Sequence, residues 1–227
     1  LTLTDIEAVC QIAHSRGIFV GVDNTLTSPI LQNPIQFGAD IVMHATTKYI
    51  GGHSDILGGA VVFKEASAWT ERVKRVQILM GATQNPLDCY LLARGLKTLP
   101  LRMREHSKNA LDLAIRLEQH PGIEQVHYPG LPSNPNYALA IKQMPNGQSG
   151  MISIQMKGDE AKARKVANTL QLFQQATSLG GVESLVEHRK SIEGPGSKTP
   201  GNLLRLSIGL EHVEDLWEDL NQAISKA

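Results

Sequence analysis

One lysine and one aspartate carry the strongest chemical signal in this chain. Asp23 directly follows the apolar residues 18–22. Lys48 lies in the hydroxyl- and glycine-rich run His44-Ala45-Thr46-Thr47-Lys48-Tyr49-Ile50-Gly51-Gly52-His53-Ser54-Asp55. A lysine amine forms a Schiff base with an aldehyde, and a carboxylate beside a ring nitrogen favours the protonated form of that nitrogen. An isolated lysine is usually a solvated surface residue, so it is the pairing of the two residues that points to chemistry.

Pyridoxal phosphate (PLP) has both of the groups that these side chains would serve. Its aldehyde takes a lysine amine, and its protonated pyridine ring acts as an electron sink. We therefore predict a PLP site in which Lys48 forms the Schiff base and Asp23 pairs with the pyridine nitrogen. The alternative for Asp23 is a turn-forming acid at the end of a strand.

The elements expected around these residues begin with a helix. Thr4 and Glu7 have the spacing of a capping box, which predicts that a helix starts at Thr4. One side of this helix is apolar, and Gly17 is a typical residue to end it.

Three apolar segments predict strands on either side of Lys48. Residues 18–22 are apolar without alternation, which indicates a fully buried strand, and residues 41–43 and 60–63 resemble them. Strands that alternate with helices favour a mostly parallel sheet covered on both faces. Ligands bind such sheets at the carboxyl ends of the strands, and both Asp23 and Lys48 lie just beyond such ends.

The second half of the chain has a different pattern. Residues 66–120 predict long helices broken near Pro86 and Pro100. Short strands at 123–128, 151–156 and 203–208 then alternate with helices at 137–143, 160–170 and 213–224. We expect two domains, a larger one over 1–105 and a smaller α+β domain over 106–227. Residues 189–201, rich in Gly, Pro, Ser and Lys, predict a mobile loop.

The composition excludes several classes of protein. Lys plus Arg and Asp plus Glu both number 22, so the net charge is zero, which argues against nucleic acid or an anionic membrane as the main partner. No apolar run reaches the length of a membrane span, and no signal-peptide pattern is present. Two cysteines, Cys10 and Cys89, make no disulfide framework, so we expect the reducing cytoplasm.

Two other kinds of site are not expected. His44 and His53 lack the partners of a metal site, so we predict no metal. The glycines at 51, 52, 58 and 59 do not have the order of a dinucleotide fingerprint and instead indicate close backbone approach around Lys48.

Six short motifs, in order over nearly the whole chain, make it resemble the Cys/Met-metabolism family of PLP enzymes. The family includes cystathionine γ-synthase, cystathionine γ- and β-lyases, methionine γ-lyase and the sulfhydrylases. The matching stretches are Val22-Asp23-Asn24-Thr25, Thr47-Lys48-Tyr49-Ile50-Gly51-Gly52-His53-Ser54-Asp55, Arg94-Gly95-Leu96-Lys97-Thr98-Leu99, Tyr128-Pro129-Gly130-Leu131, Ser178-Leu179-Gly180-Gly181-Val182-Glu183-Ser184-Leu185 and Arg205-Leu206-Ser207-Ile208-Gly209-Leu210-Glu211. The resemblance implies an α/β, aspartate-aminotransferase-like fold. It comprises a PLP-binding large domain truncated at its N-terminus and a small C-terminal α+β domain.

The resemblance also assigns roles around the cofactor. Lys48 would be the Schiff-base residue and then the base at the substrate Cα, Asp23 the pyridinium partner, Thr47 a phosphate-binding hydroxyl and Thr25 a hydrogen-bonding residue near the ring. The family usually has serine three residues before the lysine, where this chain has Ala45. One phosphate contact is therefore lost or taken over by Thr46.

A second set of residues would bind the substrate. By resemblance Arg205 grips its α-carboxylate, since a guanidinium fork matches a carboxylate with two hydrogen bonds. Ser184 would be a second carboxylate contact, and Glu183 stands where γ-synthases and γ-lyases tend to have an acid. The alternative for Arg205 is a structural ion pair.

The run after Ser184 departs from the family. Most members continue with His-Pro-x-x-Met-Thr-His, where this chain has residues 188–194 in a shorter loop. Arg189 and Lys190 could meet an acidic group of the substrate, such as the second carboxylate of cystathionine, or could be solvated loop charges.

The function implied is that of a PLP-dependent lyase or transferase of sulfur amino-acid metabolism (transsulfuration, in methionine biosynthesis or cysteine metabolism). Its substrate would be a small amino acid, cystathionine or an activated homoserine, undergoing γ-elimination or γ-replacement. The alternatives are a cystathionine β-lyase and a non-catalytic fragment acting only in subunit association. Family members are longer and typically homotetramers. Their N-terminal half, absent here, would lie on the same polypeptide or on a companion chain, and the fragment alone could be inactive.

Overall fold

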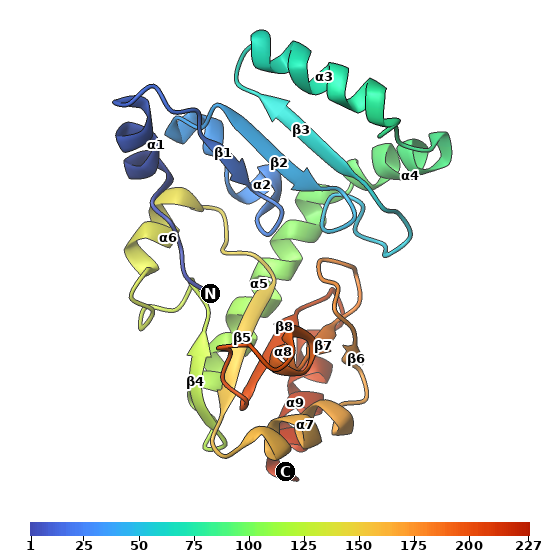
Figure 1. The fold of residues 1–227 in the computed structure, drawn as a ribbon. Helices are drawn as coiled ribbons and strands as arrows, with labels where there is room; N and C mark the ends of the chain where they lie inside the picture. The colour runs from blue at the N-terminus through green and yellow to red at the C-terminus, as the bar shows by residue number, and fades with distance from the viewer. The chain divides into compact units, whose positions relative to one another are not determined.

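The computed structural model describes residues 1–227 and has two compact units (Figure 1). The lysine unit is Thr4–Leu99, and the arginine unit is Pro100–Ala227 together with Leu1–Leu3. The expected domains, 1–105 and 106–227, remain a prediction; their boundary falls within helix α5, Leu99–Glu118.

The lysine unit is built on a three-stranded sheet in the order β1-β2-β3. Its elements are α1 (Ile6–His14), β1 (Gly21–Asp23), α2 (Ser28–Leu31), the 3-10 helix η1 (Pro34–Phe37), β2 (Ile41–Ala45), β3 (Gly59–Phe63), α3 (Ala68–Met80) and α4 (Pro86–Leu96). Strands β1 and β2 are parallel, whereas β2 and β3 are antiparallel. The expectation of a mostly parallel sheet is therefore wrong for the strands present in this chain, because β3 turns back along β2.

Two local predictions at the start of the lysine unit need correction. Asp5, not Thr4, caps α1, and its carboxylate accepts a hydrogen bond from the Ala8 amide at 3.0 Å. The helix begins one residue later than the capping-box spacing indicates, so the N-cap position falls on the aspartate. The fully buried strand expected over 18–22 is wrong: β1 is Gly21–Asp23 and has no buried residue, and Ile18 is 54% exposed. The strands at 41–43 and 60–63 are present but only partly buried, with Met43, Val61 and Val62 exposed.

Helix α3 ends at Gly81, which has the left-handed conformation, and α4 begins at a proline. Asn85 caps α4 by accepting from the Leu87 amide at 2.8 Å, and Pro86 takes the first helical position, where its missing N–H costs nothing. The predicted breaks near Pro86 and Pro100 are thus confirmed. Helix α3 has no buried residue, and large apolar side chains at its end are exposed: Ile78, Leu79 and Met80.

The arginine unit is an α+β structure with its own sheet. Its elements are α5, β4 (Ile123–His127), α6 (Tyr137–Gln143), β5 (Met151–Met156), α7 (Glu160–Thr169), β6 (Gln174–Gln175), β7 (Leu185–Glu187), α8 (Arg189–Glu193), β8 (Leu203–Ser207) and α9 (Val213–Ser225). The strand order is β4-β5-β8-β7-β6, and all pairs are antiparallel except β6 with β7. The three strands and three helices expected after residue 121 are confirmed, while β6, β7 and α8 were not predicted.

The core of the arginine unit explains why most of its helices and strands could be predicted. Helices α5, α7 and α9 place apolar residues three and four positions apart against the central strands β5 and β8. Leu113, Leu117, Ile152, Leu206 and Leu220 are all fully buried there. None of the helices is both long enough and apolar enough to cross a bilayer.

Candidate functional site

Asp23 and Lys48 follow the carboxyl ends of the two parallel strands of the lysine unit. In the β1–β2 ladder Asp23 is opposite Met43, and β2 ends at Ala45, three residues before Lys48. Parallel strands that lie side by side end at the same edge of the sheet, which is where α/β sheets bind ligands. Asp23 is exposed and Lys48 is half-buried, so both side chains can reach a bound molecule.

Thr25 fastens the ends of the two strands together. The Asp23 carboxylate accepts a hydrogen bond from the Thr25 amide at 2.9 Å, and the Thr25 hydroxyl accepts one from the Ala45 amide at 2.8 Å. The chain from Asp23 to Ala45 is thereby closed by side-chain contacts at this edge. Thr25, expected near a ring, thus also has a structural role.

Lys48 is held in a tight helical turn. Its amide donates to the Ala45 carbonyl at 3.1 Å, and its carbonyl accepts from the Gly52 amide at 2.8 Å. The neighbouring Tyr49 is fully buried and anchors the turn. The backbone of Lys48 is therefore fixed by hydrogen bonds, and the residue is half-buried.

A second glycine-dependent contact fixes the other side of this turn. A Cβ atom at Gly95, on α4, would lie 2.6 Å from the Gly51 carbonyl oxygen and 2.8 Å from that of Ile50. No side chain fits at this distance, so Gly95 lets α4 pack directly on the backbone of the lysine turn. Gly95 lies within one of the six motifs, but its place in the sequence does not predict this role.

The hydroxyl residues before Lys48 have different surroundings. The Thr47 hydroxyl accepts from the Gly58 amide at 2.9 Å and is half-buried. The Thr46 hydroxyl is buried and has no hydrogen-bond partner. A buried hydroxyl without a partner costs free energy, and it is a donor that a bound oxyanion could accept from.

His44 is a neutral residue beside this edge. Burial lowers the pKa of its imidazole, and the nearby Asp23 charge only partly opposes that effect. The structure contains no group of three or more His, Cys, Asp and Glu side chains that could hold a metal ion.

In the arginine unit, Arg205 lies opposite an acid in the sheet. Arg205 of β8 pairs with Glu187 of β7, and its Nη2 lies 2.6 Å from the Glu187 carboxylate. The same nitrogen donates to the carbonyl oxygens of Thr177 at 2.8 Å and Ser178 at 3.1 Å. Glu187 is buried, so this is a strong and well-fixed contact.

Ser184 lies close by, in a network of its own. Its hydroxyl is fully buried, donates to Glu211 at 2.8 Å and accepts from the Gly209 amide at 2.8 Å. Its amide also donates to Glu211 at 2.7 Å. The hydroxyl proton is therefore used inside the protein, and Glu211 fixes the loop that carries Glu183, which is half-buried.

The segment after β7, predicted as a loop, begins with a short helix. Residues Arg189–Glu193 form helix α8, and Arg189 pairs with Glu193 at 2.7 Å and with Glu187 at 3.1 Å. Glu193 also accepts from Ser197 and from Thr199, and these contacts lower the pKa of Glu193 to about 2. Residues 189–193 are therefore helical where a loop was predicted, because the pairing of Arg189 with Glu193 could not be seen in the Gly- and Pro-rich composition; the mobility of 189–201 stays a prediction.

The second basic residue of this loop is also paired. Lys190 lies 3.0 Å from Glu160 on α7. Arg189 and Lys190 thus have carboxylate partners within the protein, which favours a structural role for both over contact with a substrate.

The structure brings the predicted residues together in two groups. Asp23, Thr25, Thr47 and Lys48 share one edge of the sheet in the lysine unit. A separate group in the arginine unit comprises Glu183, Ser184 and Arg205. Glu187 and Glu211 complete the second group and were missed; the acid at 187 could have been noticed only by pairing β7 with β8.

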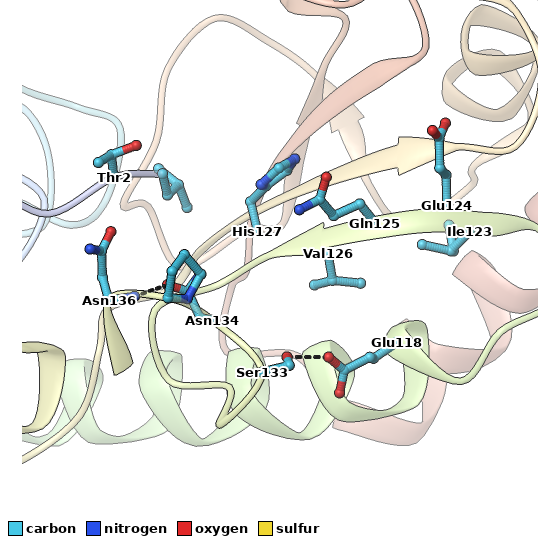
Figure 2. A pocket seen from close by; sticks show the side chains of 12 residues that line it. Thr2, Glu118, Ile123, Glu124, Gln125, Val126, His127, Ser133, Asn134 and Asn136 are labelled. Carbon is cyan, nitrogen blue, oxygen red and sulfur yellow. Dashed lines mark hydrogen bonds between the residues drawn. The ribbon is translucent and has the colours of Figure 1, made fainter. Parts of the chain in front are cut away.

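A cavity of about 430 Å³ elsewhere in the arginine unit contains none of these residues. Figure 2 shows Glu118 and Ser133, which share a hydrogen bond, and His127 among the side chains that line it. Its lining contains neither a lysine nor an arginine, the residue types on which the predicted chemistry depends. It is therefore not part of the candidate site.

Comparisons with known proteins agree with the chemistry of these groups. Residues 1–225 match the model of the family "Cys/Met metabolism PLP-dependent enzyme". The chain is 45% identical over 99% of its length to the cystathionine gamma-synthase of Mycobacterium tuberculosis and covers 58% of that protein. It is 43% identical over 99% of its length to the cystathionine beta-lyase of Coxiella burnetii, covering 60% of it.

Solved structures show the same similarity. The crystal structure of metB from Corynebacterium glutamicum matches all of this chain with a TM-score of 0.95 and 43% identity, over 60% of its own length. CalE6, a methionine gamma lyase from Micromonospora echinospora, matches 99% of the chain with a TM-score of 0.94 and 39% identity. The chain thus spans about three fifths of the length of these relatives.

Proposed function

Because the chain belongs to the Cys/Met metabolism family of PLP-dependent enzymes, we propose that it carries the lysine and arginine parts of a transsulfuration active site. The proposed reaction is γ-elimination or γ-replacement on cystathionine or an activated homoserine. The observation that carries the proposal is the placement of Asp23 and Lys48 at the carboxyl ends of the parallel strands β1 and β2. Glu183 supports γ-chemistry, and cystathionine β-lyase is the alternative within the family.

The donor set of the lysine unit fits the cofactor of this family. An amine, a carboxylate and two hydroxyls lie within one short segment of sheet edge, and the Thr46 hydroxyl is buried without a partner. Lys48 would hold the cofactor aldehyde, Asp23 its ring nitrogen, and Thr47 and Thr46 its phosphate, with Thr25 beside the ring. When bound, PLP supplies an electron-withdrawing ring that makes the substrate Cα proton acidic.

Two side chains of the chain would control the protons in the reaction. Lys48, once its amine is free, takes the proton at Cα and returns it to another carbon of the substrate. Asp23 keeps a proton on the ring nitrogen because a negative charge beside that nitrogen favours its protonated form.

The arginine unit would orient the substrate. Arg205 binds the α-carboxylate and so fixes which Cα bond is aligned for proton removal. We propose that Ser184 contributes through the loop that it and Glu211 hold, because its hydroxyl proton already has an acceptor.

The setting of this site is also a proposal. We infer a cytoplasmic homo-oligomer, a tetramer by resemblance, whose remaining residues lie on the same polypeptide or on a companion chain. The exposed apolar end of α3, Ile78 to Met80, supports association, since monomeric proteins seldom expose such a cluster.

A covalent labelling experiment tests the cofactor site. The chain is incubated with PLP, reduced with borohydride and digested, and its peptides are analysed by mass spectrometry. We expect a phosphopyridoxyl adduct on Lys48 and none on any other lysine, with the Lys48→Ala variant as the control. Adducts spread over several lysines at equal yield would refute a dedicated site.

The products decide the reaction. With uptake of water, γ-elimination from L-cystathionine releases cysteine, 2-oxobutyrate and ammonia, and β-elimination releases homocysteine, pyruvate and ammonia. γ-Replacement forms cystathionine from an activated homoserine and cysteine and releases the activating group. We expect 2-oxobutyrate or cystathionine from the enzyme that contains this chain. Pyruvate as the only keto acid would make it a β-lyase, and no turnover with any of these substrates would favour the non-catalytic alternative.

A further inference from the structure

Glu187 is a buried carboxylate placed between two arginines. Its side chain is 3% exposed, and it lies 2.6 Å from Arg205 and 3.1 Å from Arg189. A carboxylate is rarely buried unless it is paired, because the loss of hydration must be offset by hydrogen bonds. Glu187 meets this requirement with two cationic partners, one hydrogen-bonded and one at ion-pair distance.

The contact with Arg205 restrains the guanidinium at one nitrogen. Nη2 of Arg205 donates to the carbonyls of Thr177 and Ser178 and lies 2.6 Å from the Glu187 carboxylate, so it contacts two different segments. Residues 187 and 205 are also directly opposite in the β7–β8 ladder, so the backbone sets their separation. A planar guanidinium held at one nitrogen has its remaining edge aimed in one direction.

We propose that Glu187 is a positioning residue for substrate binding, which holds the Arg205 guanidinium in the orientation that receives an α-carboxylate. This inference rests on the proposed function, in which Arg205 binds that carboxylate. Glu187 itself contacts no substrate. Because Glu187 already restrains the Arg205 side chain, substrate binding loses less side-chain entropy at Arg205.

Arg189 is the second cationic partner of Glu187. Its Nη1 donates to both oxygens of the Glu187 carboxylate. Arg189 is in turn paired with Glu193, so positive and negative groups alternate from Arg205 to Glu193.

The test compares two variants that break the same pair in different ways. Glu187→Gln removes the negative charge that both arginines contact. Arg189→Gln breaks only the Glu187–Arg189 pair and leaves the contact between Glu187 and Arg205. Both variants lose the tie between β7 and α8, so a purely structural effect would be common to them.

Steady-state kinetics on L-cystathionine, with the holoenzyme that contains this chain, gives the first readout. For Glu187→Gln we expect KM to rise about tenfold or more with kcat within about twofold of the parent, since a charge-assisted hydrogen bond is lost. Arg189→Gln should change KM by less than about threefold. Equal increases in KM for both variants, or no increase for Glu187→Gln, would overturn the inference.

A spectroscopic readout does not depend on activity. The Nε–H signal of Arg205, assigned by its absence in Arg205→Lys, is recorded in the ¹⁵N-labelled protein without substrate. It should keep its position in Arg189→Gln and shift or broaden in Glu187→Gln; an unchanged signal in Glu187→Gln would contradict the proposed positioning.

Arg205→Lys separates a failure of the proposed function from a failure of the positioning role of Glu187. If it leaves KM unchanged, Arg205 does not bind the carboxylate, and the proposed function fails at this residue. If Arg205→Lys raises KM while Glu187→Gln does not, the carboxylate site stands and the positioning role alone is refuted.

Discussion

The close packing of α4 on the lysine turn makes Gly95→Ala the most informative single substitution. The added methyl carbon would lie 2.6 Å from the Gly51 carbonyl oxygen and 2.8 Å from the Ile50 oxygen. Real Cβ atoms essentially never approach other atoms below 3.0 Å, and ordinary contact begins at 3.4 Å. Because both neighbours are backbone atoms, α4 or the turn must move by several tenths of an ångström or more.

The expected change in stability is the balance of two effects. Replacing a helical glycine with alanine stabilises the helix by about 0.5–1 kcal/mol, because the unfolded glycine has more freedom to lose. Overpacking a site that cannot relax costs about 1–3 kcal/mol. Both close atoms are carbonyls of the turn, so we expect the upper part of that range and a net loss of about 1–2 kcal/mol.

Urea denaturation of the chain and of its variants measures this balance. Ala93→Gly, at an exposed position of the same helix, measures the helix-propensity effect alone and should destabilise by about 1 kcal/mol. Gly95→Ala should also lower the yield of the Lys48 adduct after borohydride reduction, because the turn that carries the lysine is displaced. A Gly95→Ala variant more stable than the parent, with undiminished labelling, would refute the reasoning.

Three further predictions concern stability and can be checked by the same unfolding measurements. Asp5→Ala should cost about 1 kcal/mol through loss of the α1 cap, whereas capping by Thr4 would leave this variant unchanged. Asp219, which is buried and accepts from the amides of residues 171, 172 and 173, should cost about 2–3 kcal/mol when changed to Asn; Asp215→Asn, exposed on the same helix, is the control and an equal loss there would disprove the role. Burial lowers the pKa of His106 to about 4 from 6.5, so the unfolded state binds the extra proton first and the free energy of unfolding should fall, by roughly 3 kcal/mol, as the pH drops from 6.5 to 4. His106→Asn, which can still donate to the Ile208 carbonyl, should reduce that pH dependence; an unchanged slope would show that other groups cause it.

The parts of the fold that the sequence predicts are those with a local physical cause. Pro86 and Pro100 cannot continue a preceding helix, so the breaks between helices could be placed from the sequence. The apolar spacing of α9 and the apolar residues of β5, interrupted only by Ser153 and Gln155, likewise indicate one kind of element each. Asp23 and Lys48 could be paired because both follow apolar strands, whatever the details of the sheet.

The parts that could not be predicted depend on partners distant in the sequence. Strand β7 is only three residues long, and Glu187 becomes recognisable as a partner of Arg205 only through the β7–β8 register. Thr4 and Asp5 are both good capping residues, and only the helix start decides between them. Gly95 looks like an ordinary helix glycine until the carbonyls of the turn are placed beside it.

The division of the chain into two units has a consequence for how it folds. The core of the arginine unit is formed entirely by residues from 110 onward, whereas the core cluster around Ile6 and Cys10 contains only residues of the lysine unit. The two clusters share no side chain, so each unit has a core cluster of its own. Native-state hydrogen exchange should therefore resolve two cooperative units. The slow amides should belong to β5 and β8 of the arginine unit, while the lysine turn should exchange faster.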